Sequence, residues 1–356
     1  MKLVVTGGAG FIGSNFVRHV VSAHPAWSVV VIDKLTYAGN LKNLADVLEN
    51  GRAEFVKLDI SDPEVREILR GCDAVVHFAA ESHVDRSIEN PAPFVRTNVE
   101  GTQRLLEESR RAGIGRFLHV STDEVYGSLK TSDGKFVETS RLAPNSPYAA
   151  TKASADLIVL SYFKTFGFPA IISRCSNNYG PYQFPEKFIP LIVCQAFANE
   201  PVPIYGDGLN VRDWIHVLDH CTALELILCS GRDGEIYNVG GDCEMTNLEV
   251  ARQVLDLLGK PHDLIRFVAD RPGHDRRYAI DCSKLKDSLG WRRSLHFEQG
   301  LRDTVEWYGQ NSHWLREIRS NEYREYFAKH YLQRARFLDG LKGSARCADS
   351  MSKPTC

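Results

Sequence analysis

Residues 2–13 read KLVVTGGAGFIG, and this stretch decides the fold of the chain. An apolar run ends at Thr6, and glycines then recur at Gly7, Gly10 and Gly13 before a segment of helical periodicity. Glycine at such positions allows a tight turn, a close approach of the backbone to a pyrophosphate, and close packing of the helix on the strand. The N–H groups at the start of the helix favour an anion. A strand, a glycine-rich turn and a helix in this order predict a dinucleotide site.

Short apolar runs alternate with helical segments through the first half of the chain. Each run is rich in Val, Ile, Leu or Phe, as expected of parallel strands that are buried on both faces. The runs are Leu3–Thr6, Val29–Asp33, Phe55–Asp59, Ala74–Phe78, Phe117–Ser121 and Ile171–Cys175. Helical periodicity marks Phe11–Ala23 and Val95–Ala112, and Ser61 followed by Pro63 predicts a further helix start. The alternation predicts an α/β fold with a doubly wound parallel sheet of the Rossmann type.

The rhythm changes after about residue 176. We expect residues 1–176 to form the dinucleotide-binding domain and residues 177–330 to form a smaller, mostly helical substrate lobe. Strands near 211–240, such as Glu235–Val239, leave this boundary open, because they can belong to either part. The later helices are expected at Asn247–Leu258, Phe297–Gln310 and His313–Lys329. Residues 336–356 are polar and aperiodic, which predicts a disordered tail.

The composition excludes several classes of protein. Of the 356 residues 43% are hydrophobic, and the net charge is −2 without a long basic run, so no nucleic acid is expected as a partner. No apolar stretch approaches about 20 residues, so we expect no membrane span. No signal peptide is evident, so we expect no export. The nine cysteines form no C-x-x-C pair, as expected of reduced thiols in the cytoplasm. His216 and His220 lie four residues apart without an obvious third ligand, so we expect no metal site.

Two acidic residues end predicted strands next to the dinucleotide site. Asp33 follows Gly13 by 20 residues, where a carboxylate accepts hydrogen bonds from ribose hydroxyls and repels a 2′-phosphate. This position predicts NAD as the cofactor rather than NADP, although the adjacent Lys34 weakens the preference. Asp59 ends the third run and is either an adenine contact or a cap of its strand.

A second group of residues suits the oxidation of a hydroxyl group. Tyr148 and Lys152 are four apart, which places both on one face of a helix. An ammonium near a phenol lowers the pKa of the phenol, so we expect Tyr148 to act as a base. Ser121 and Thr122, at a strand end, provide a hydroxyl that can hold the same substrate oxygen. The order of these motifs resembles the extended short-chain dehydrogenase/reductase family, from residue 1 to about 330.

The pair Asp123-Glu124 follows directly after this strand end. In an arbitrary protein, two adjacent carboxylates are often a solvated loop pair. Beside a nicotinamide site they have a chemical use. Oxidation at C4 of a hexose acidifies the C5 proton, so one carboxylate can remove that proton while the other group protonates the departing C6 hydroxyl. Simple dehydrogenases and 4-epimerases need neither group, and the pair therefore predicts a dehydration.

Four segments carry a closer resemblance. They read AAESHVDRS at 79–87, STDEVYG at 121–127, SNNYGP at 176–181 and DRPGHDRRY at 270–278, and they resemble dTDP-glucose 4,6-dehydratases. The resemblance implies that Asp123 is the acid, Glu124 the base, Tyr148 with Lys152 the oxidation pair, and Thr122 a contact of the sugar O4. It also implies a tightly bound NAD that is regenerated in each turnover, a homodimer, and a 4-keto-6-deoxy sugar nucleotide as product.

The resemblance further implies two sets of binding residues. The cofactor set is Gly7, Gly10, Phe11, Ile12, Gly13, Asp33, Lys34, Leu35, Thr36, Asp59, Ile60, Phe78, Ala79, Ala80, Ser82, Thr97, Tyr148, Lys152 and Asn178. The substrate set is Ser82, Thr122, Asn177, Lys187, Phe188, Pro203, Ile204, Tyr205, Arg212, Asn247, Asp270, Arg271 and His274.

Chemistry supports some members of these sets more than others. Arg212 and Arg271 suit a diphosphate as bidentate donors, with surface ion pairs as the alternative. Residues 203–205 form either an apolar wall with a ring that stacks on the base, or a plain loop. Residues 78–80 are mostly small. They either allow the cofactor to approach the backbone closely or only fill space at the end of the strand.

Three alternatives stay open at this point. A 4-epimerase or a decarboxylase of the same fold shares the oxidation step without the elimination. A protein that only senses NAD, without turnover, would need none of the four reactive side chains. The nucleotide of the substrate is dTDP in the resembled family, while UDP and CDP are compatible with the residues.

Overall fold

The computed structural model describes residues 1–318, 325–334, 336–339 and 341, and divides the chain into two compact units. Unit 1 comprises Met1–Gln183, Val211–Met245 and Asp275–Thr304, and unit 2 comprises Phe184–Asn210, Thr246–His274 and Val305–Cys356. The units are thus interleaved along the chain, whereas we expected one boundary near residue 176 and left the strands near 211–240 open to either part. Residues 211–245 belong to unit 1, because a strand within them pairs with its main sheet.

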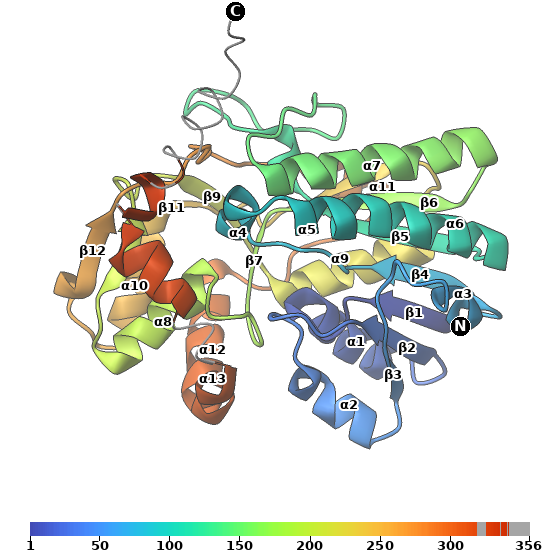
Figure 1. Cartoon of the computed structure of the whole chain (residues 1–356), viewed down its shortest axis with the longest axis horizontal. Coiled ribbons are helices and arrows are strands. Elements are labelled where there is room, and N and C mark those ends of the chain that lie inside the picture. Colours follow the sequence, from blue (N-terminus) through green and yellow to red (C-terminus); the bar gives the residue numbers. More distant parts are fainter. Residues whose placement is uncertain (319–324, 335, 340, 342–356) are drawn as a thin grey trace, which may run out of the picture. The chain divides into compact units, whose positions relative to one another are not determined.

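A seven-stranded sheet forms the centre of unit 1 (Figure 1). Its order is β3 (Ala53–Lys57), β2 (Ser28–Asp33), β1 (Lys2–Thr6), β4 (Ala74–His77), β5 (Arg116–Thr122), β6 (Ala170–Cys175) and β10 (Ile236–Val239). All neighbouring strands pair in parallel. The predicted doubly wound fold is confirmed. The strand order reverses between β1 and β4, and ligands of such sheets bind outside the carboxyl ends of the strands at that point.

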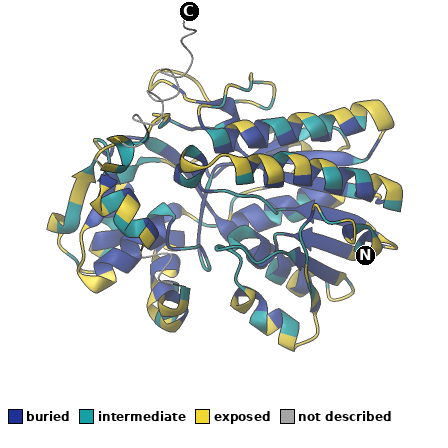
Figure 2. Ribbon diagram, in the orientation of Figure 1, coloured by how far each residue is buried: buried dark blue, intermediate teal, exposed yellow. Residues whose placement is uncertain are grey.

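Each face of this sheet is buried by its own set of helices. Leu3 and Val5 of β1 pack with α1 (Phe11–Ala23) and α9 (Val217–Ser230), whereas Val4 faces α3 (Val65–Leu69), α6 (Thr102–Ala112) and α7 (Pro147–Phe166). Successive side chains of a strand point to opposite faces, so an unbroken apolar run is what a doubly covered sheet requires. Figure 2 shows the result, in which the strands are buried and the helices are exposed mainly on their outer sides.

The helix that carries Tyr148 and Lys152 is α7 (Pro147–Phe166). It begins where the Ser146 hydroxyl accepts a hydrogen bond from the Ala149 N–H, and Pro147 occupies the first turn. It ends at Gly167, which has a φ of 64°. A polar cap, an early proline and a left-handed glycine are the usual limits of a helix. The sequence therefore fixes α7 at both ends.

The prediction of a helix capped by Ser61 is wrong. Helix α3 runs from Val65 to Leu69, and the Ser61 hydroxyl instead donates to Asp59 Oδ1 at 2.8 Å. The two residues form a local turn that competes with helix capping. The expected helix 95–112 is divided into a π-helical segment, η2 (Val95–Gly101), and α6 (Thr102–Ala112).

The other elements of unit 1 are short. They are η1 (Leu41–Leu44), α2 (Ala45–Glu49), α3 (Val65–Leu69), α4 (Val84–Glu89), α5 (Ala92–Phe94), η3 (Asp123–Tyr126) and α11 (Ser283–Leu289). A second sheet has the order β11 (Glu244–Thr246), β9 (Val211–His216) and β7 (Asn177–Tyr179). Helix α12 (Phe297–Gln310) has the predicted bounds and passes from the segments of unit 1 to those of unit 2.

Unit 2 contains helices and one small parallel sheet. Its helices are α8 (Phe188–Ala198), α10 (Asn247–Leu257), η4 (His262–Leu264), α13 (Ser312–Ile318) and η5 (Ala328–Leu332). Its strands are β8 (Val202–Tyr205) and β12 (Ile265–Val268). The helix predicted at 313–329 coincides with α13 in part, and its residues 319–324 lie outside the described residues. Of the predicted tail, residues 336–339 are helical instead, and all the others except 341 lie outside the described residues. Among the described helices, none has the length and hydrophobicity of a membrane span.

Candidate active site

The glycine turn lies against the loop that follows β4. Gly7 has a φ of 69°, and a Cβ at this position would lie 2.5 Å from the N atom of Ala79. A Cβ on Gly13 would lie 2.4 Å from the Gly7 carbonyl oxygen. Only glycine fits at either position. Gly10 precedes α1, and Phe11 and Ile12 lie in the first turn of this helix. That turn has no acidic residue and no side-chain cap in the described part of the chain. Its backbone N–H groups are therefore suited to bind a pyrophosphate.

Asp33 ties the end of β2 to this turn. Its Oδ2 accepts a hydrogen bond from the Ala9 N–H at 3.0 Å, and its Oδ1 accepts one from the Leu35 N–H at 2.8 Å. Burial raises the pKa of Asp33, although these two bonds and the charge of Lys34 oppose the shift. Each oxygen keeps a second lone pair, so the carboxylate can still accept from a ribose hydroxyl. Thr36 follows in the same half-buried loop.

Lys34 brings together three of the predicted cofactor residues. Its Nζ lies 3.3 Å from Asp59 Oδ2 and donates to the Thr97 hydroxyl at 3.1 Å. Burial raises the pKa of Asp59, but the bonds from Ser61 and the charge of Lys34 outweigh burial and lower it. Asp59 therefore stays anionic at the end of β3. Ile60 next to it is buried in the core on the α3, α6 and α7 side of the sheet.

The loop after β4 holds the remaining predicted cofactor residues of this region. Phe78, Ala79, Ala80 and Ser82 are half-buried there. The Asn98 side chain fixes this loop, because its Oδ1 accepts from the Glu81 N–H at 2.8 Å and its Nδ2 donates to the Glu81 carbonyl at 2.9 Å. A rigid loop beside the glycine turn is what a bound cofactor needs.

The Asp123-Glu124 pair lies in η3, immediately beyond β5. The Thr122 hydroxyl accepts a hydrogen bond from the Glu124 N–H at 3.3 Å and donates to Asp123 Oδ1 at 3.4 Å. Asp123 is only 2% exposed, and its Oδ2 has no hydrogen-bond partner among the described residues. Glu124 is half-buried. The two carboxyl groups thus have different surroundings although they are adjacent in sequence.

These surroundings favour a protonated Asp123. Burial is the largest cause that raises the pKa of Asp123 well above its usual value, and the charges of Glu124 and Asp213 add to it. The charge of Arg212 and a hydrogen bond with Thr122 oppose the shift. A carboxyl group that stays neutral near pH 7 can act as a general acid.

Tyr148 and Lys152 lie on one face of α7, as predicted. The prediction that the pKa of Tyr148 is lowered is wrong, because the structure raises it. Burial raises the pKa of Tyr148 well above 10, and Glu124 adds to the shift, while a hydrogen bond with Thr122 lowers it. Lys152 Nζ donates to the Val120 carbonyl at 2.9 Å. Burial also lowers the pKa of Lys152 to about 8. Desolvation outweighs the attraction on which the prediction was based.

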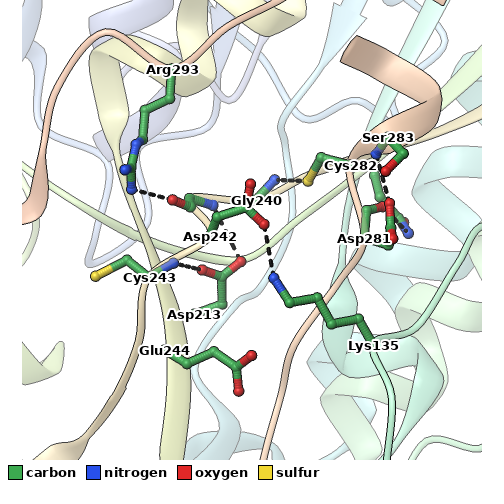
Figure 3. A network of polar contacts seen from close by, with 12 residues as sticks. Lys135, Asp213, Gly240, Asp242, Cys243, Glu244, Asp281, Cys282, Ser283 and Arg293 are labelled. Carbon is green, nitrogen blue, oxygen red and sulfur yellow. Dashed lines mark hydrogen bonds and ion pairs between the residues drawn. The ribbon is translucent and has the colours of Figure 1, made fainter. Parts of the chain in front are cut away.

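Asp213 is a buried carboxylate that the sequence did not suggest. It is 0% exposed and accepts hydrogen bonds from the Gly241 N–H at 3.2 Å and from the Cys243 N–H at 2.7 Å (Figure 3). Burial raises the pKa of Asp213 to about 6. Lys135 reaches the same loop through Asp242, at 2.8 Å. These hydrogen bonds hold the loop after β10 in place. The negative charge of Asp213 raises the pKa of Asp123.

Arg212 packs inside unit 1. Its guanidinium lies 4.4 Å from the centre of the Tyr278 ring, and it donates to the carbonyl oxygens of Val211 and Asp275 at 2.7 and 3.0 Å. It is 5% exposed. This arginine lowers the pKa of Asp123, so it acts on the acid–base pair electrostatically. Its predicted contact with a diphosphate stays a prediction.

Asn177 and Asn178 belong to β7. His220 of α9 lies with Nδ1 at 2.9 Å from Asn178 Oδ1, and the Asn178 Nδ2 donates to the Ser176 carbonyl at 3.0 Å. Burial lowers the pKa of His220 to about 3, so the ring is neutral and holds the amide by a hydrogen bond. His220 thus has a structural partner. No group of three or more potential metal ligands occurs among the described residues.

The remaining predicted substrate residues belong to unit 2. His274 Nδ1 lies 2.6 Å from Asp270 Oδ1, and the Tyr205 ring stacks on Tyr331 with 5.6 Å between centroids. Arg334 lies 4.5 Å from the centre of the same Tyr205 ring. Tyr331 and Arg334 were not predicted. Pro203 and Ile204 are buried in β8, Lys187 and Phe188 begin α8, Asn247 begins α10, and Arg271 follows Asp270.

The fold and the reactive side chains together define a class. A Rossmann-type sheet has a glycine turn at its switch point, and a buried tyrosine–lysine pair lies on α7 with a hydroxyl and two carboxyl groups at the end of the adjacent β5. This combination is that of the extended short-chain dehydrogenases/reductases that carry an additional acid–base pair.

The comparisons with known proteins narrow the class. The family model described as GDP-mannose 4,6 dehydratase matches residues 4–304. The dTDP-glucose 4,6-dehydratase of Streptomyces niveus is 50% identical over 325 residues, which are 90% of this chain and 96% of that protein. The dTDP-glucose 4,6-dehydratase of Xanthomonas campestris pv. campestris strain B100 is 53% identical and covers 90% of this chain and 97% of its own.

Solved structures agree. DesIV, a dTDP-glucose 4,6-dehydratase from Streptomyces venezuelae solved with NAD and dTDP bound, has a TM-score of 0.86 and 53% identity, and covers 88% of this chain and 98% of its own. A UDP-glucuronic acid 4-epimerase from Bacillus cereus has a TM-score of 0.82 but 29% identity, over 87% of this chain and all of its own. The chain belongs to the dTDP-glucose 4,6-dehydratase family, as its sequence motifs indicated.

Proposed function

We propose that this protein converts dTDP-glucose into dTDP-4-keto-6-deoxyglucose with NAD as a cofactor that is regenerated in each turnover. The observation that carries the proposal is Asp123, a buried carboxyl group whose pKa is raised well above its usual value by burial, next to Glu124 and within the electrostatic range of Tyr148. A dehydration requires such an acid in addition to the oxidation pair. Family membership supplies the substrate.

The residues at the glycine turn fit NAD. Gly7 and Gly13 leave room that a Cβ would fill, the start of α1 offers N–H groups to the pyrophosphate, and Asp33 can accept from the ribose. When bound, NAD supplies the hydride acceptor for oxidation at C4 and the hydride donor for reduction at C6.

The side chains of this chain perform the proton transfers. Burial raises the pKa of Tyr148 in the ligand-free protein, so Tyr148 would accept the proton of the 4-hydroxyl group with the help of the Lys152 ammonium and of the positive charge that NAD would bring. The Thr122 hydroxyl would hold the same oxygen. Glu124 removes the proton from C5, which the C4 ketone has acidified. Asp123 gives its proton to the C6 hydroxyl, and water leaves. C5 is reprotonated to complete the product, a 4-keto-6-deoxy sugar nucleotide.

Turnover of three substrates tests the proposal. We expect the purified protein to convert dTDP-glucose with a kcat/KM well above the values for UDP-glucose and CDP-glucose. The product should be lighter by one water and should show the absorbance of a 4-keto sugar in alkali. A product of unchanged mass would identify a 4-epimerase. A protein that converts none of the three but releases carbon dioxide from a nucleotide-linked uronic acid, added as a fourth substrate, would be a decarboxylase.

The homodimer and the cytoplasmic location belong to this proposal as well. Leu157 and Phe166 on α7 are 59% and 54% exposed, and Val95 on the adjacent η2 is 43% exposed. Leu157 supports the dimer most directly, because a large apolar side chain that is exposed on a helix favours contact with a second copy of the chain.

A further inference from the structure

A third ionisable residue continues the stripe of Tyr148 and Lys152 on α7. Asp156 follows Lys152 by four residues, so all three side chains lie on one face of the helix. Tyr148, Lys152 and Asp156 are 8%, 4% and 0% exposed. The proposed mechanism uses only the first two.

Asp156 forms a buried ion pair with β6. Its Oδ2 accepts a hydrogen bond from Arg174 Nε at 2.8 Å, and Arg174 is 2% exposed. The guanidinium also lies 4.8 Å from the centre of the Tyr126 ring. Removing two charges from water is costly, so a buried ion pair is weak evidence of a purely stabilising role. Its position next to Lys152 suggests a role in the reaction.

His119 of β5 links Asp156 to Lys152. Its Nε2 lies 3.4 Å from Lys152 Nζ and 3.5 Å from Asp156 Oδ1, while its Nδ1 has no hydrogen-bond partner among the described residues. Burial, followed by the charge of Lys152, lowers the pKa of His119 to about 4, so the ring is neutral. The single nitrogen Nε2 therefore either accepts from the ammonium or donates to the carboxylate.

The charge state of Lys152 depends on this neighbourhood. Burial lowers the pKa of Lys152 to about 8, and Asp156 is the largest cause that opposes the shift. The pKa of Asp156 is raised by burial, but the hydrogen bond with His119 and the charge of Arg174 outweigh burial and lower it. Asp156 is therefore an anion, and it favours the protonated form of Lys152.

We propose that Asp156 is a positioning residue whose charge holds Lys152 as an ammonium beside Tyr148 during oxidation, with the neutral His119 ring lying between the two charged groups. This inference rests on the proposed function. With Lys152 and Arg174 cationic and Asp156 anionic, the cluster carries one positive charge, which favours the phenolate of Tyr148. Without Asp156, two cations would share one buried site, and Lys152 would release its proton at a lower pH.

The other groups that face Lys152 do not replace Asp156. They come from β4 and β6, and are His77 and Cys175. Burial lowers the pKa of His77 well below its usual value and raises the pKa of Cys175 to about 12, so both are neutral.

The test compares Asp156→Asn with a matched control. The amide of Asn can still accept from Arg174, so the variant removes the charge and little else. We expect the alkaline limb of the kcat profile to move to lower pH by about one unit, because Lys152 then loses its proton earlier. The control is Glu108→Gln, which removes a carboxylate that is 1% exposed and paired with Arg66 on the α3–α6 side. It should lower the melting temperature without moving the limb.

A second measurement uses the ligand-free protein. The pKa of Lys152 is lower in the folded protein than the usual value of about 10.4 in an unfolded chain, so this group adds stability as pH rises between the two values. In Asp156→Asn that rise should begin at lower pH, which thermal denaturation across pH will reveal. Asp156→Glu keeps the carboxylate and should restore both curves.

Each outcome decides the inference. If Asp156→Asn does not fold, Asp156→Asn with Arg174→Met removes both charges together and leaves Lys152 as the one cation of the cluster, so the limb should stay near its wild-type pH, and a limb that moves by a full unit in this double variant would overturn the inference. A folded Asp156→Asn single variant whose limb and denaturation curve match those of the wild type overturns it as well. Wild-type protein that fails to dehydrate dTDP-glucose would instead overturn the proposed function, and the denaturation curves would still test the effect of Asp156 on Lys152.

Discussion

At the scale of single residues, Asp123 shows how a catalytic environment opposes stability. Burial raises the pKa of this carboxyl group well above its usual value in the folded protein, whereas in the unfolded chain it ionises near about 3.9. A group whose folded pKa is raised contributes full stability only below the unfolded pKa, and that contribution falls as pH rises towards the folded pKa. At neutral pH, Asp123 is therefore destabilising.

Asp123→Asn should separate these two properties. Asparagine has no charge to desolvate, so we expect the melting temperature at pH 7 to rise by about 2–4 °C, as for a gain of about 1 kcal/mol in a domain of this size. Oxidation at C4 should persist, visible as reduced nicotinamide, while the release of water stops. Calorimetry and product mass measure both effects in one preparation.

Glu124→Gln is the comparison for that variant. Glu124 is half-buried, so its replacement should raise the melting temperature less while it also stops dehydration and the exchange of the C5 proton with deuterated water. Unimpaired dehydration in either variant would contradict the assigned acid and base.

Residues that are close in sequence were predictable, and those that meet only in space were not. Thr122, Asp123 and Glu124 are consecutive, and Tyr148 and Lys152 are one helical turn apart. Asp213 approaches this group from β9, after the chain has passed through unit 2, and no local pattern announces it. Lone aspartates and histidines are common in any sequence, so only the fold identifies the ones that matter.

At the scale of elements, the glycine turn is where sequence and backbone geometry correspond most closely. Helix α1 has the predicted bounds, since the glycines before it fix its start. The turn at Ser61 was missed because a serine beside an aspartate can satisfy either a cap or a local turn, and the structure has the turn. The η2 segment was also missed, because a π-helix has no distinct apolar period.

Gly7→Ala should abolish cofactor binding and destabilise the protein. The new Cβ would meet the backbone of Ala79 at 2.5 Å, and backbone cannot give way as a flexible side chain does. The control is Gly113→Ala, which shares the positive φ, 75° against 69°, but has nothing within 4 Å of the added Cβ. It should lose only about 1–2 kcal/mol from the left-handed conformation. Titration with NAD and urea denaturation distinguish them; equal losses in the two variants would mean that strain alone matters at Gly7.

At the scale of the whole molecule, the interleaving of the two units could not be read from the sequence. The chain leaves unit 1 after Gln183 and returns to it at Val211 and again at Asp275. A composition shift near residue 176 was visible, but strand pairing such as that of β10 with β6 joins residues more than sixty positions apart. Period and propensity are local properties, and they carry no information on which sheet a returning strand will join.

The exposed apolar side chains of α7 make the proposed dimer testable. A charge at Leu157, which is 59% exposed, would be buried without a partner if α7 packs against a second copy, so Leu157→Arg should convert the dimer into monomers. Leu41→Arg is the matched control, because Leu41 is also an exposed leucine of unit 1, at 40%, but lies on η1 rather than on α7. Sedimentation velocity should give a dimer for the wild type and the control. A monomeric wild type, or a Leu157→Arg variant that remains dimeric, would remove α7 from the proposed interface. The same helix carries Tyr148, Lys152 and Asp156. If α7 shifts when the dimer dissociates, we therefore expect the monomer to lose dehydratase activity.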